Sequence, residues 1–110
     1  MAWYHYVAHV FAGVFLTNSI PHFVSGLQGR AMQSPFASPP GIGLSSSTVN
    51  VLWGASNLAA GYFLLLHVGS FDVRNLADVA VVAVPALVFS VFMARRFGRF
   101  HGGNTPRSQA

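Results

Sequence analysis

Five polar side chains lie within or directly beside apolar segments, and their types could support binding or catalysis. They are Asn18, His22, Arg30, Asn50 and Asn57. An imidazole can act as an acid or a base, amides donate and accept hydrogen bonds, and a guanidinium binds phosphate. At about 100° per helical residue, Asn18 and His22 share one helix face, and Asn50 and Asn57 share a face of a second helix. The set predicts a site for a lipid or isoprenoid head group, with His22 as acid or base and Arg30 as the phosphate-binding group.

The same amides and imidazole can instead hold two helices together, and we expect this structural role first. An Asn or His facing lipid is costly, so both polar faces should turn toward each other. Gly54 and Gly61 fall on the second face and would let the two backbones approach. Pro21 leaves the carbonyl of Thr17 without its helical partner, a deficit that a nearby side chain could repair. Under this interpretation the protein acts by assembly, as a homo-oligomer or an accessory subunit of a larger membrane complex.

Three other histidines suggest a second kind of site. His5 and His9 are four residues apart, a spacing suitable for a metal or haem pair, and His67 is expected at matching depth. His5 and His9 lie roughly 150° or more around the helix from the face that carries Asn18 and His22, so they would need another subunit or a rotated helix to complete a site. The alternative is that they are interfacial histidines beside Trp3. The sequence identifies no cofactor.

The composition indicates an integral membrane protein. The chain is 53% hydrophobic and only 7% charged, whereas soluble domains average about 25% charged residues. Its six basic residues are all Arg, and the formal net charge is +4. Because the arginines flank apolar runs, we expect membrane lipids with anionic head groups as partners, and no nucleic acid.

Three segments are long enough to cross a membrane, because a hydrocarbon core needs roughly 20 helical residues. They are residues 3–26, 48–68 and 77–94. We therefore predict an all-α membrane protein with three transmembrane helices and a structured Pro/Gly/Ser-rich loop between the first two. Ser46 or Ser47 and Asn75 are expected to cap the later helices. Residues 1–100 form one membrane domain in this prediction, and residues 101–110 a disordered tail.

The placement of arginine predicts the orientation. Arg30 lies in the first loop, and the remaining arginines of that side (95, 96, 99 and 107) follow the third span. Only Arg74 lies on the opposite side. The excess of positive charge places the loop and the C-terminus in the cytoplasm and the N-terminus outside.

Three stretches within residues 17–65 resemble a family of small bacterial integral membrane proteins. They read TNSIPHFVSGLQGR, SPFASPPGIGLSSS and NVLWGASNLAAGY. The resemblance implies a small multi-span protein of the bacterial inner membrane. No activity, cofactor or partner follows from it.

Overall fold

The computed structural model describes residues 1–107, which form three long helices and one short pair of strands. The helices are α1 (Trp3–Leu27), α2 (Ser47–Leu66) and α3 (Leu76–His101), and the strands are β1 (Met32–Gln33) and β2 (Leu44–Ser45). All three helices are long and apolar enough to cross a membrane. The predicted helical class, with three helices long and apolar enough to span a membrane, is therefore confirmed.

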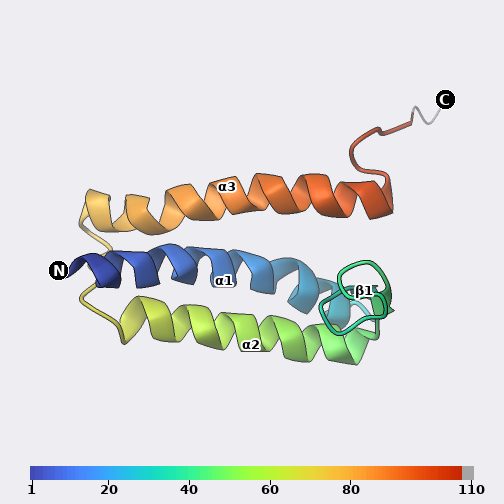
Figure 1. The fold of residues 1–110 in the computed structure, drawn as a ribbon, viewed down its shortest axis with the longest axis horizontal. Helices are drawn as coiled ribbons and strands as arrows, with labels where there is room; N and C mark the ends of the chain where they lie inside the picture. Colours follow the sequence, from blue (N-terminus) through green and yellow to red (C-terminus); the bar gives the residue numbers. More distant parts are fainter. Residues whose placement is uncertain (108–110) are drawn as a thin grey trace.

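The three helices lie side by side, with α1 in the middle (Figure 1). The described chain measures 50 × 31 × 22 Å along its principal axes, consistent with a layer rather than a closed bundle. The loop that carries β1 and β2 lies at the end where α1 stops and α2 starts. Because α1 lies between α2 and α3, a side chain on the face of α1 that neither helix covers can have α2 on one side and α3 on the other.

Glycines permit the close packing of α1 on α2. A Cβ added at Gly54 would lie 2.6 Å from the backbone nitrogen of Phe23, and one at Gly61 would lie 2.6 Å from Cγ of Leu16. Real Cβ atoms do not approach so closely, so a larger residue at position 54 would push the helices apart, and one at position 61 would displace the Leu16 side chain. The predicted role of Gly54 and Gly61 is confirmed.

Side-chain caps begin the two later helices. Ser46 Oγ accepts a hydrogen bond from the Val49 N–H at 3.2 Å. Asn75 Oδ1 accepts from the N–H groups of Ala77 and Asp78 at 2.9 and 3.3 Å. These bonds satisfy amides that have no partner inside a helix, and both predicted caps are confirmed.

The loop between α1 and α2 is tied together by backbone and hydroxyl bonds. Its two strands are antiparallel, with Met32 opposite Ser45 and Gln33 opposite Leu44. The hydroxyls of Ser34 and Ser45 are hydrogen-bonded to each other. The Gly41 N–H donates to the Ser34 carbonyl at 2.8 Å. These bonds join segments of the loop that are 7 to 13 residues apart in the sequence.

The third helix continues past its predicted end at residue 94 to His101. Apolar length measures how much of a helix suits lipid, whereas Arg is itself a good helix former, so α3 extends through its arginines. It ends at Gly102, whose φ of 80° suits glycine. Of the predicted tail, His101 belongs to α3 and residues 102–107 are described; the chain turns at Gly102, and Asn104 Nδ2 donates to the Arg95 carbonyl at 2.8 Å. Residues 108–110 lie outside the described residues.

Candidate functional site

Two polar pairs join α1 to α2 as their helix faces predict. Asn18 Nδ2 donates to Asn57 Oδ1 at 3.0 Å, and His22 Nδ1 lies 2.8 Å from Asn50 Oδ1. His22, Asn50 and Asn57 are only 3%, 0% and 2% exposed. The predicted contact between the two polar helix faces is therefore confirmed. Both pairs form within a single chain.

The surroundings of Asn50 determine which nitrogen of His22 carries the proton. Asn50 Nδ2 lies 3.2 Å from the Met32 carbonyl, 3.2 Å from that of Ser45 and 3.0 Å from that of Ser46. Carbonyl oxygens only accept, so the amide nitrogen must face them and Oδ1 must face His22. The Nδ1–H of His22 therefore donates to Asn50. In a neutral ring, Nε2 then has a free lone pair and can accept a hydrogen bond.

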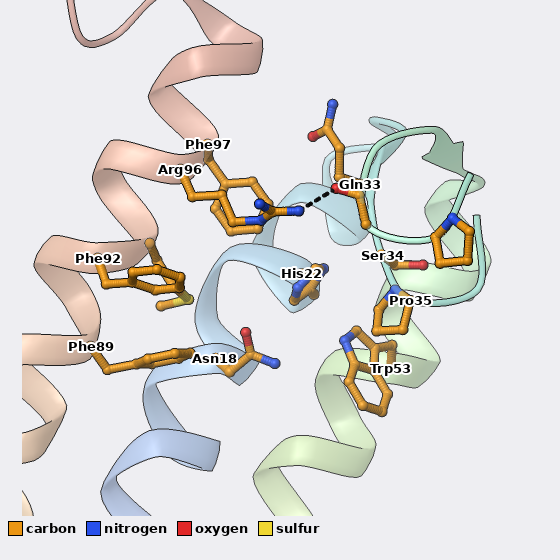
Figure 2. Close-up of a pocket in the computed structure, with 13 residues that line it drawn as sticks. Asn18, His22, Gln33, Ser34, Pro35, Trp53, Phe89, Phe92, Arg96 and Phe97 are labelled. Atoms are coloured by element: carbon orange, nitrogen blue, oxygen red, sulfur yellow. Dashed lines mark hydrogen bonds between the residues drawn. The ribbon is translucent and has the colours of Figure 1, made fainter. Parts of the chain in front are cut away.

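His22 lines a cavity of about 370 Å³, within the size range of small-molecule sites. Figure 2 shows that the cavity lies between α3 and the α1–α2 pair, beside the loop. Its apolar wall comes from Phe89, Phe92, Met93 and Phe97 on α3. The polar groups come mostly from the opposite elements, so the cavity is amphipathic.

Two polar atoms of this lining have no hydrogen-bond partner among residues 1–107. They are Trp53 Nε1, a donor, and Gln33 Oε1, an acceptor, and both are buried. Both residues line the cavity with His22, and the indole of Trp53 packs edge-on to the His22 ring at a centroid distance of 6.5 Å. An unpaired buried polar group costs about 1–3 kcal/mol. A ligand that pairs these groups would recover that cost.

Arg96 connects α3 to the loop at the rim of the cavity. Its Nη2 donates to the Gly41 carbonyl at 3.0 Å (Figure 2). The guanidinium also lies 5.8 Å from the centroid of the Phe100 ring. This is the cationic group that the cavity contains.

Arg30, the arginine predicted to bind phosphate beside His22, does not line this cavity. It lines a separate hollow with Gln28 and His101. The reason is the turn that ends α1: Gly29 has a φ of 72°, and the Arg30 N–H folds back to donate to the Ser25 carbonyl at 3.0 Å.

Asn50 and Asn57 also lie outside the cavity lining, whereas Asn18 and His22 belong to it. Both buried amides use their atoms within the protein: Asn57 Nδ2 donates to the Trp53 carbonyl at 2.8 Å. They are hydrogen-bonded to the two cavity residues, Asn18 and His22.

The outer histidines have separate partners. The His9 Nε2–H donates to the Val68 carbonyl at 2.7 Å, and the His5 Nδ1 accepts from the Ala2 N–H at 3.2 Å. The ring of His67 stacks on Phe63 at 5.7 Å. Among residues 1–107, no three His, Cys, Asp or Glu side chains are placed to hold a metal ion.

The sequence interpretation did not identify Gln33, Trp53, Arg96 or the aromatic wall of α3 as site residues. The signal for the wall is the spacing of Phe89, Phe92 and Arg96, which puts them near one helix face. Because the predicted span ends at residue 94, Arg96 falls outside it, and the three residues do not stand out as one helix face. The unpaired atoms of Gln33 and Trp53 depend on the packing and have no local sequence signal.

No protein family, characterised protein or solved structure matches this chain. A functional proposal for this chain therefore rests on the geometry of the site.

Proposed function

We propose that this is an integral membrane protein that binds a membrane-soluble amphiphile through a hydroxyl head group in the His22 cavity. The observation that carries the proposal is a complementary pair on one cavity wall: the acceptor His22 Nε2 and the unpaired donor Trp53 Nε1–H. Placing both beside an aromatic wall favours a ligand with one polar end and an apolar body.

A hydroxyl group fits this pair because it donates and accepts through one oxygen. It can donate to His22 Nε2 and accept from Trp53 Nε1–H. The centroids of the two rings are 6.5 Å apart, so both groups belong to the same part of the cavity lining. The hydrocarbon part would pack against Phe89 and Phe92. An isoprenoid alcohol is the simplest ligand of this kind.

We further propose that the cavity opens at the cytoplasmic face of the bacterial inner membrane. Support comes from the arginines, since Arg30 and the arginines of α3 outnumber Arg74 at the other end. The exposed Phe36, Ile42 and Leu44 of the loop suit a structured loop that lies at the membrane surface.

Binding is preferred to assembly as the principal role because the polar stripes need no second subunit. The Asn18–Asn57 and His22–Asn50 pairs are satisfied within one chain. The exposed Leu87, Val88 and Val91 of α3 suit lipid as well as a partner helix. They give no reason to choose a homo-oligomer or accessory subunit over a lipid-surrounded monomer.

The test measures equilibrium binding of farnesol and of its methyl ether to the protein in phosphatidylcholine nanodiscs, with empty discs subtracted. The ether can accept from Trp53 but cannot donate to His22, so it should bind about three- to tenfold more weakly, the effect of losing one hydrogen bond. The substitution Trp53→Phe should weaken farnesol binding by a similar factor. Trp3→Phe is the matched control, because Trp3 is 75% exposed at the other end of α1.

Equal binding of the alcohol and the ether would contradict the proposal. So would equal effects of the two tryptophan substitutions. Native mass spectrometry of the same samples would report the number of chains with the bound ligand, and a ligand found only on oligomers would favour assembly.

A further inference from the structure

A second hollow lies at the C-terminal end of α3 and is strongly positive. It has a volume of about 300 Å³ and is lined by Phe92, Arg95, Arg96, Arg99 and Asn104. Arg95 and Arg99 are four residues apart and share a helix face, with Arg96 beside them. Three arginines therefore line one space.

Among residues 1–107, no side-chain carboxylate pairs with these arginines. The only acids of the chain are Asp72 and Asp78, and Asp78 lies in the first turn of α3. At about 1.5 Å per residue, roughly 25 Å of helix separates it from Arg95. Among residues 1–107, Arg96 is the arginine of this group whose guanidinium donates a hydrogen bond, and its acceptor is the Gly41 carbonyl. The repulsion among the three cations would be relieved by a bound anion.

The wall of the hollow is built by the fold, so the arginines are not merely scattered over a surface. The left-handed Gly102 turns the chain back along α3. Asn104 then packs on Gly98, where an added Cβ would lie 2.5 Å from Asn104 Oδ1. The bond from Asn104 Nδ2 to the Arg95 carbonyl, at 2.8 Å, fixes this turn. A small residue at position 98 is what allows the hollow to form.

We propose that this hollow binds the phosphodiester head group of an anionic phospholipid. Guanidinium groups match phosphate oxygens in charge and in planar, two-pronged geometry. Phe92, which is 57% exposed, borders the same hollow and offers a surface for an acyl chain. The hollow lies at one end of a helix apolar enough to cross a membrane, the level at which phospholipid head groups are found.

This site is distinct from the proposed hydroxyl site. The two cavities share Phe92 and Arg96, but the second contains neither His22 nor Trp53. Its ligand is an anion, whereas the His22 cavity suits a neutral head group. Either site can therefore exist without the other.

Native mass spectrometry in detergent tests the proposal by comparing retention of phosphatidylglycerol and phosphatidylcholine. The wild-type protein should prefer phosphatidylglycerol by about tenfold or more, as expected for several arginines near one phosphate. The double variant Arg95→Gln/Arg99→Gln should lose this preference. The control Arg30→Gln/Arg74→Gln removes the same charge from outside the hollow and should keep the preference. Helix content by circular dichroism verifies that both variants are folded.

The substitution Gly98→Ala keeps every charge and displaces Asn104, so it should reduce the preference severalfold while α3 remains helical. Equal loss in the two double variants would overturn the proposal, because net charge alone would then explain lipid binding. It would also be overturned by equal retention of both lipids in the wild type. Displacement of phosphatidylglycerol by inorganic phosphate at equal concentration would show a site for a free anion instead of a lipid.

Discussion

Asn50 joins three parts of the chain through one side chain. Its amide nitrogen faces the carbonyls of β1, β2 and the residue that caps α2, and its oxygen accepts from His22. The amide therefore holds the loop against α2 and fixes the proton of the imidazole on Nδ1. Asn50 thus acts on the cavity through His22, as a positioning residue.

Replacement of Asn50 by Ala should destabilise the protein. The substitution leaves the His22 Nδ1–H without its partner and removes the amide bonds to three loop carbonyls, which predicts a loss of about 1–3 kcal/mol in the free energy of unfolding. Reversible unfolding in mixed detergent measures it. Ser56→Ala on the same helix removes a hydroxyl that bonds the Leu52 carbonyl at an exposed position and should change stability by less than about 0.5 kcal/mol. Equal losses in the two variants would contradict the role of Asn50.

The interhelical pairs could be predicted from the sequence because the helical period fixes which residues share a face. Asn18 and Asn57, and His22 and Asn50, also have matching depths in their helices. The place of Arg30 could not be predicted in this way. It depends on the turn at Gly29, and a change in the path of two or three residues moves a long side chain to another side of the helix.

Helices α1 and α2 pack closely against each other, and glycines on α2 set the distance between them. Apolar length predicted the ends of both helices to within two residues. The Pro-, Gly- and Ser-rich loop between them marks where α1 ends and α2 begins. The end of α3 was not predictable from hydropathy. The Arg-rich segment is polar but still helical, and the helix stops only where Gly102 turns the chain.

Gly54→Ala tests the contact between α1 and α2. The added methyl group would lie 2.6 Å from the Phe23 nitrogen, and relief of this overlap must separate the helices, at a cost of about 1–3 kcal/mol. Thermal unfolding in detergent should show a lower midpoint. Ala55→Ser, which also adds one heavy atom but at an exposed position of α2, should leave the midpoint nearly unchanged. If the two variants unfold at the same temperature, the close approach does not support the fold.

At the scale of the whole molecule, the cavity exists because α3 lies along one side of the α1–α2 unit and not across both helices (Figure 1). The position of α3 could not be predicted from the sequence. The Val- and Ala-rich first part of α3 has no polar stripe that would fix its rotation, and its aromatic residues could equally face lipid. Its position depends on contacts such as the Arg96 bond to Gly41.

The orientation of the molecule in the membrane is a separate prediction. Because most arginines lie with the loop and the C-terminal end of α3, a reporter fused to the C-terminus should be active in the cytoplasm. A phosphatase reporter, which folds only outside, should be inactive there. Activity of the phosphatase fusion would place the cavity at the outer face.

Nuclear magnetic resonance of the indole N–H groups in nanodiscs shows whether a hydroxyl amphiphile binds between His22 and Trp53. The chain has two tryptophans, so the spectrum contains one signal from Trp53 in the cavity and one from Trp3 as an internal control. Farnesol should shift the Trp53 signal as its N–H gains a hydrogen bond and leave the Trp3 signal in place. A Trp53 signal that does not move at saturating farnesol, or two signals that move equally, would contradict binding of the hydroxyl group at Trp53.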